Sequence, residues 1–146
     1  MKKLILLLLA VFIWQSCNNF NSKEHIELGI PIHDLVITLR GTTYQPVPSQ
    51  CNSDPLHTAN MTRVNLKELK NGSQKLCAFS YDLIKQYQLK FGDQFDVYTS
   101  KGKYLGRYTF CDRMNRRIKN TCDLMIHPQD KPDLYKNMVV KRVIVR

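Results

Sequence analysis

Two aspartates, each directly after a cysteine, are the residues of this chain whose type and spacing best suit chemistry. Asp112 and Asp123 lie in the segment CDRMNRRIKNTCDLMI, residues 111–126, with a basic run between them. Carboxylates that lie close together repel each other, which raises the pKa of at least one and leaves a protonated acid for proton transfer. Aspartates at strand ends can instead cap turns by accepting backbone N–H groups. The spacing alone leaves both interpretations open.

The elements that must position these aspartates have the alternating pattern of strands. We predict strands over residues 35–39, 75–80, 94–99, 104–111, 122–126 and 137–145, the third and fourth forming a hairpin around SKGK. Residues 81–87 and 131–137 are expected to form short helices, and the proline-containing residues 41–56 to lack regular structure. Together these segments predict a mainly β fold, a small and mostly antiparallel barrel. Since Asp112 closes one strand and Asp123 opens the next, we expect both at one end of the barrel.

The N-terminus has the layout of a bacterial secretory signal. Two lysines precede an apolar run from Leu4 to Trp14, which is shorter than the ~20 residues that span a bilayer. Cys17 follows at the position that lipoprotein processing acylates, although ordinary secretion is the alternative. We therefore expect a lipoprotein signal peptide over residues 1–16, a lipidated tether over 17–33 and one domain over 34–146. The expected location is the cell envelope, with the lipid in the membrane and the domain facing the periplasm or the cell exterior.

The chain carries a formal net charge of +10. A basic exported domain attracts acidic partners, such as peptidoglycan carboxylates or anionic headgroups. Nucleic acid fits the charge but not the compartment, so we do not expect it as a partner. A basic surface that only confers solubility is the plainer alternative.

Four cysteines follow Cys17, and in an oxidising compartment an even number indicates two disulfides with three possible pairings. If the strands that flank the basic run are neighbours, Cys111 pairs with Cys122, and Cys51 with Cys77. Side-chain alternation supports this pairing in CDLMI, but in YTFCD Phe110 has the parity of Asp112. No two cysteines have the close spacing of a zinc site, and we predict neither a metal nor another cofactor.

An ordered series of short motifs resembles the 3D domain, a double-psi β-barrel named for three aspartates and found in MltA-type lytic transglycosylases and small cell-wall proteins. The motifs are GTTYQPVPSQC, TAN, KLCAFSYDLI, FGDQFDVY, GRYTFCDR and CDLMI. The eleven-residue interval from Asp112 to Asp123 matches the family, whereas the basic run lacks the family's glycines. Asp82 falls two residues later than the family's third aspartate. The resemblance implies a six-stranded double-psi β-barrel.

The resemblance also implies an activity. The aspartate at the position of Asp123 is taken in the family as the sole acid/base, which cleaves the bond between N-acetylmuramic acid and N-acetylglucosamine and leaves 1,6-anhydro ends. Asp112 would position Asp123 and raise its pKa, and Asp82 would complete the trio. Residues expected to contact substrate are Tyr44, Thr58, Arg113, Arg116 and Arg117.

Catalysis is one of three hypotheses that the sequence leaves open. The second is a non-catalytic module that binds peptidoglycan through the barrel and the basic run. The third is a structural or inhibitory lipoprotein without glycan contact. The two-domain transglycosylases hold glycan between two domains, so a partner protein would have to complete such a groove here.

Overall fold

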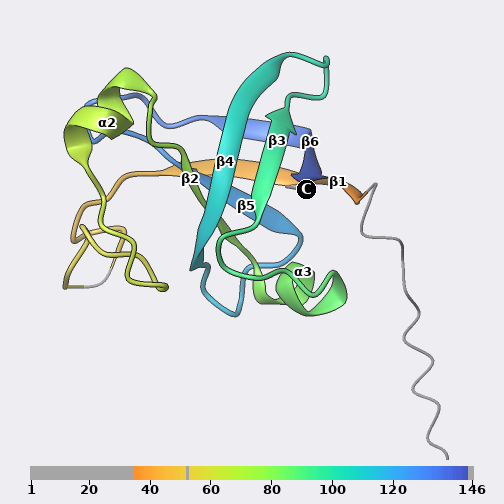
Figure 1. Ribbon diagram of the computed structural model, residues 1–146, viewed down its shortest axis with the longest axis horizontal. Coiled ribbons are helices and arrows are strands. Elements are labelled where there is room, and N and C mark those ends of the chain that lie inside the picture. The colour runs from red at the N-terminus through yellow and green to blue at the C-terminus, as the bar shows by residue number, and fades with distance from the viewer. Residues whose placement is uncertain (1–34, 52, 145–146) are drawn as a thin grey trace, which may run out of the picture. The chain divides into compact units, whose positions relative to one another are not determined.

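The computed structural model describes residues 35–51 and 53–144, which form a closed barrel of six strands with two short helices (Figure 1). The prediction of a mainly β, six-stranded barrel is thereby confirmed. The predicted signal peptide, Cys17 and the tether over 17–33 lie outside the described residues. Within the described part, no helix is long and apolar enough to cross a membrane.

Neighbouring strands in the barrel are mostly distant in sequence. The strands are β1 (Val36–Tyr44), β2 (Leu76–Phe79), β3 (Gln94–Tyr98), β4 (Tyr104–Arg113), β5 (Thr121–Met125) and β6 (Leu134–Val143). Their order around the barrel is β1-β5-β2-β4-β3-β6. The pairs β1–β5 and β2–β4 are parallel, and the other four are antiparallel. Strand β2 therefore lies between β4, which carries Asp112, and β5, which carries Asp123.

Alternating apolar side chains fill the barrel. Buried and less buried residues alternate along the first part of β1 and along the whole of β3. At the centre, the ring of Phe79 lies 4.9 Å from that of Phe95 and 5.3 Å from that of Phe110. Each of these side chains is at most 1% exposed, and burying one contributes about 1.5–3 kcal/mol. This packing stabilises the pairing of the strands. It therefore also positions the side chains that point away from the core.

Helix α2 (Leu66–Asn71) is an element that the sequence analysis missed. Its N-cap is Asn65, whose side chain accepts from the backbone N–H of Glu68 and donates to the Glu68 carboxylate. Gly72 ends the helix in the left-handed conformation, at φ 78°. Leu69 is the only buried residue of this helix, so its apolar periodicity is weak. The capping pattern N-x-x-E with a later glycine was the available signal.

Helix α3 (Tyr81–Gln86) confirms the helix expected over 81–87, but two other expectations were wrong. Residues 131–137 do not form a helix, because the chain from Leu134 onward pairs with β1 and later with β3. Residues Gly41–Tyr44 are not irregular, because they pair with β5. In both cases hydrogen bonds to distant strands decided the conformation.

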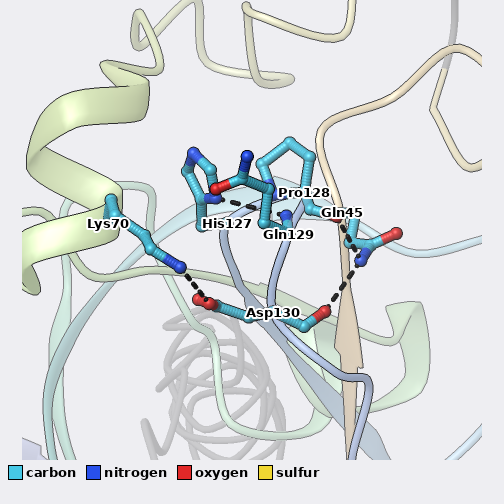
Figure 2. A network of polar contacts seen from close by, with 6 residues as sticks. All are labelled: Gln45, Lys70, His127, Pro128, Gln129 and Asp130. Carbon is cyan, nitrogen blue, oxygen red and sulfur yellow. Dashed lines mark hydrogen bonds and ion pairs between the residues drawn. The ribbon is translucent and has the colours of Figure 1, made fainter.

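A second apolar cluster lies between the barrel, α2 and the connection after β1. It consists of Tyr44, Val64, Leu69, Leu76, Ala78, Cys111, Met114 and Met125. The loop after β5 is fastened beside it, since the Gln45 amide donates to the backbone carbonyls of Pro128 and Asp130, at 3.0 and 2.9 Å (Figure 2). Lys70 of α2 pairs with the Asp130 carboxylate at 2.7 Å. These contacts tie the end of β1, α2 and the loop after β5 together.

Candidate functional site

Four residues form a row across four neighbouring strands. Thr42 on β1 lies opposite Asp123 on β5, and Asp123 lies opposite Ala78 on β2. On its other side, Ala78 lies opposite Asp112 on β4. The row thus places the two predicted carboxylates on either side of a methyl side chain, which leaves space above it.

A bulge in β4 puts Asp112 on this face. Regular alternation would direct Asp112 to the same side as Phe110, into the barrel core. Cys77 lies opposite Phe110, but the next residue, Ala78, lies opposite Asp112, so Cys111 is an extra residue in β4. The bulge reverses the parity of Asp112, and its side chain lines a cavity together with Ala78 and Asp123.

The cavity above the row measures about 520 Å³. Its walls come from the row itself, from the connection after β1 and from the basic run. Lining residues include Tyr44, Cys51, Thr58, Ala59, Tyr81, Arg113 and Ile118. The sequence analysis had selected Tyr44, Thr58 and Arg113 from this set, and the structure brings all three to the cavity. Two further lining residues, Ala78 and Tyr81, were missed, and so was Thr42, which bonds to Asp123.

Asp123 carries the most informative carboxyl group of the site. Burial raises its pKa to about 6, with a further contribution from the charge of Asp112, while a hydrogen bond from Thr42 acts in the opposite direction. The Thr42 hydroxyl donates to Asp123 Oδ1 at 2.7 Å. Among the described residues, no group donates a hydrogen bond to the other oxygen, Oδ2. A carboxyl group with this pKa can both give and take a proton near neutral pH.

Asp112 is held by three donors. Its Oδ1 accepts from the backbone N–H of Ala59 at 3.1 Å and from that of Arg113 at 2.9 Å. Its Oδ2 accepts from the Tyr44 hydroxyl at 3.3 Å. Burial, followed by the charge of Asp112, raises the pKa of Tyr44, so the phenol stays protonated and able to donate. Asp112 is therefore a fixed carboxylate beside Asp123.

The Thr58 side chain forms its hydrogen bonds within its own loop. It is only 4% exposed, and its hydroxyl lies 2.7 Å from the Asn60 side-chain oxygen. The backbone carbonyl of Thr58 accepts from Met61 N–H at 2.8 Å, which closes a turn. That turn presents the Ala59 N–H to Asp112. Thr58 lines the cavity, as predicted, but in this structure its hydroxyl is engaged within the protein.

Asp82 is not among the residues that line the cavity. It lies in the first turn of α3, where its Oδ2 accepts from the backbone N–H of Asn120 at 2.9 Å. Desolvation alone would raise the pKa of Asp82, but hydrogen bonds, first from Asn120 and then from Ser80, outweigh it and lower the pKa. The structure thus separates Asp82 from the other two candidates and uses it to hold the end of the basic run.

The basic run folds without glycine because two asparagines shape it. The Asn115 side chain accepts from Arg117 N–H, and its carbonyl accepts from Ile118 N–H. Asn120 adopts the left-handed conformation, at φ 47°, which asparagine tolerates better than most residues. Met114 is buried in the second cluster and anchors the start of the run. The arginines between these anchors remain on the surface.

The cysteines are arranged differently from the prediction. Cys51, Cys77, Cys111 and Cys122 are all free thiols in the structure, so neither predicted disulfide is formed. Cys77 and Cys122 belong to the barrel core, and Cys122 contacts Cys77. Cys111 instead belongs to the second cluster, against which Cys51 packs. The physical reason is that β2 lies between β4 and β5, so the two strands are not neighbours, and that Cys111 points to the face opposite the core residue Phe110.

Among the described residues, no three histidine, cysteine, aspartate or glutamate side chains form a group that could hold a metal ion. The sequence was also compared with protein-family models and with curated proteins, and none of them matches it. The site must therefore be interpreted from its own geometry.

Proposed function

We propose that this chain cleaves peptidoglycan glycan strands in the manner of a lytic transglycosylase, with Asp123 as the single acid/base. The observation that carries the proposal is the carboxyl group of Asp123, whose pKa is raised to about 6 in a cavity of about 520 Å³. At neutral pH a fraction of such groups is protonated, whereas an ordinary aspartate is almost fully ionised.

The proposed reaction needs only one carboxyl group. Protonated Asp123 gives its proton to the glycosidic oxygen as the bond from that oxygen to C1 of N-acetylmuramic acid breaks. The muramoyl 6-hydroxyl then attacks C1, and its proton goes to the Asp123 carboxylate, which restores the acid. An ordinary glycosidase needs a second carboxylate to act on water or on C1, but here the nucleophile belongs to the substrate.

The neighbours of Asp123 fit this role. Asp112 contributes to the raised pKa of Asp123, and it is positioned by Tyr44, Ala59 and Arg113. Thr42 keeps Asp123 Oδ1 in place at 2.7 Å, so Oδ2 is the oxygen available for proton transfer. Asp82 does not take part directly in the proposed reaction.

The barrel topology also supports a double-psi β-barrel of the 3D type. Two parallel pairs, β1–β5 and β2–β4, interrupt an otherwise antiparallel barrel. The two aspartates that the motif comparison selected occur on β4 and β5, on either side of β2. An envelope lipoprotein, anchored through Cys17, is the cellular setting that we propose on the N-terminal sequence.

A non-catalytic peptidoglycan-binding module is the second candidate. It is favoured by the exposed cations Arg113, Arg116 and Arg117 beside the cavity, which can hold acidic wall polymers without any turnover. In this case a partner protein that completes a glycan groove would supply the catalysis.

The decisive experiment is digestion of purified peptidoglycan sacculi with products identified by mass spectrometry. The unmodified chain should release 1,6-anhydromuropeptides, and Asp123→Asn should not. Asp133→Asn is the matched control, since Asp133 is exposed and does not line the cavity. If the unmodified chain releases no anhydro products while a known transglycosylase does, the catalytic proposal is wrong. Co-sedimentation of the inactive chain with sacculi would then favour the binding module.

A further inference from the structure

Two arginines of the basic run stack on aromatic rings at the edge of the cavity. The guanidinium of Arg116 lies 5.1 Å from the ring centroid of Tyr81, and that of Arg113 lies 5.8 Å from the same ring. Arg113 also lies 5.4 Å from the ring centroid of Phe91. Two like charges are thus held over one ring, although they repel each other.

The aromatic rings come from separate segments that the fold brings together. Tyr81 is the first residue of α3 and lines the cavity. Phe91 is 40% exposed and its ring lies 4.9 Å from that of Phe110, which is part of the barrel core. The aromatic surface is therefore supported by the core, and stacking on it restricts the arginine side chains before any ligand binds.

Neither guanidinium is neutralised within the residues that the structure describes. None of the ion pairs there includes Arg113 or Arg116. Asp112 and Asp82, which adjoin Arg113 and Tyr81 in sequence, have other partners. Asp112 accepts from Ala59, Tyr44 and the backbone of Arg113, and Asp82 accepts from Asn120. Among the described residues, no hydrogen bond uses a side-chain N–H group of Arg113 or Arg116, so these groups can donate to a ligand.

We infer that Arg113 and Arg116, on Tyr81 and Phe91, form a carboxylate-binding subsite for the acidic peptides attached to the glycan. A carboxylate accepts two parallel N–H bonds from one guanidinium, and a second guanidinium adjacent to it strengthens the attraction. The subsite adjoins the wall of the cavity that holds Asp123, because Tyr81 and Arg113 line both. This inference rests on the proposed function for the identity of the ligand, and it predicts that glycan bearing acidic peptides binds better than bare glycan.

The test measures binding rather than turnover, by calorimetry with the full-length chain in detergent. The probes are a disaccharide tetrapeptide with free carboxylates, the same compound with its carboxylates amidated, a peptide-free glycan of equal length, and the free acidic tetrapeptide. The variants are Arg113→Gln with Arg116→Gln, and as a matched control Lys101→Gln with Lys103→Gln in the turn between β3 and β4. Both doubles remove two exposed charges, but Lys101 and Lys103 do not line the cavity and make none of the ring contacts found among the described residues.

The unmodified chain should bind the acidic probe about tenfold more tightly than the amidated one. The Arg113 and Arg116 double variant should lose this preference with an unchanged melting temperature, and the control double should keep it. Equal loss in the two doubles, or no preference in the unmodified chain, would overturn the subsite. Binding or cleavage of peptide-free glycan without any such preference would leave the proposed function standing. If the free peptide binds in an Arg113-dependent way but no glycan binds or is cleaved, the subsite stands and the proposed function fails.

Discussion

Asp112 and Asp123 lie opposite the same residue, Ala78, from the two strands that flank β2. One pairing is parallel and the other antiparallel, so carboxylates eleven residues apart in sequence meet across a strand from a distant part of the chain. The small methyl group of Ala78 leaves space between them. Burial, with a further contribution from the charge of Asp112, raises the pKa of Asp123.

Replacing Asp123 by asparagine should stabilise the fold at neutral pH. The pKa of Asp123 rises from 3.8 to about 6 on folding, so the folded chain binds more protons than the unfolded chain between these values. Its contribution is fully favourable below pH 3.8 and is lost as the pH rises through 6. Asp123→Asn should therefore raise the free energy of unfolding by up to roughly 3 kcal/mol at pH 8 and by little at pH 4. Urea denaturation at the two pH values checks this, and equal effects at both would contradict it.

Removing the Thr42 hydroxyl should raise the pKa of Asp123 further. The hydrogen bond from Thr42 at 2.7 Å favours the ionised carboxylate, and valine keeps the shape without the donor. We expect Thr42→Val to shift the titration of Asp123 upward by about one unit, and Thr42→Ser to leave it near the original value. The side-chain carboxyl resonance in a carbon-13 NMR titration reports this directly. A downward shift of the Asp123 pKa in Thr42→Val would contradict the role of this hydrogen bond in favouring the ionised carboxylate.

Enlarging Ala78 should close the space between the two carboxylates. Its side chain lines the cavity and packs in the second cluster, so Ala78→Val adds two methyl groups between the carboxylates and crowds the cluster. We expect a loss of about 1–3 kcal/mol in stability and at least tenfold weaker glycan binding or cleavage. Ala78→Ser is the control for a change at this position with less added bulk. Full activity of the folded valine variant would argue that ligands do not enter this part of the cavity.

Replacing Asp82 should affect the basic run more than the acid/base chemistry. Asparagine keeps the shape of the side chain but weakens its bond to the Asn120 N–H, which costs about 1 kcal/mol. Asp82→Asn should leave the pKa of Asp123 near 6 and reduce product release by less than tenfold. The pH profile and the yield of anhydromuropeptides, measured beside Asp123→Asn, separate the two roles. A loss of product release as large as that of Asp123→Asn would indicate that Asp82 takes part in catalysis.

Thiol alkylation of the native protein should distinguish Cys51 from the other described cysteines. Cys51 is partly exposed, whereas Cys77, Cys111 and Cys122 have no exposed surface. Burial raises the pKa of Cys77 and Cys111, which keeps them as unreactive thiols. Iodoacetamide should label Cys51 first, and non-reducing peptide maps should show no Cys111–Cys122 link. Recovery of that link would contradict the separation of Cys111 and Cys122 by β2.

Local patterns were enough to predict the β class and most of the strands. Alternating apolar residues marked β3, β4 and β5, and the SKGK turn marked the hairpin, because side-chain period and turn chemistry are local properties. The two aspartates were also selected from sequence, because carboxyl groups suit acid chemistry and their eleven-residue interval resembles that of the 3D domain. The capped helix α2 was missed because its signal lies in Asn65 and Gly72 rather than in apolar periodicity.

The sequence by itself therefore determined the β class and most of the strands, and it selected Asp112 and Asp123 as candidates for acid chemistry. Only the tertiary structure decided that Asp112 faces the cavity, because that depends on a bulge set by pairing with β2. It likewise decided that Asp82 lies apart, that Thr42 holds Asp123, and that Cys111 and Cys122 belong to different clusters. Each of these outcomes depends on register between strands far apart in the chain, and a shift of one residue in register would reverse which side chains meet.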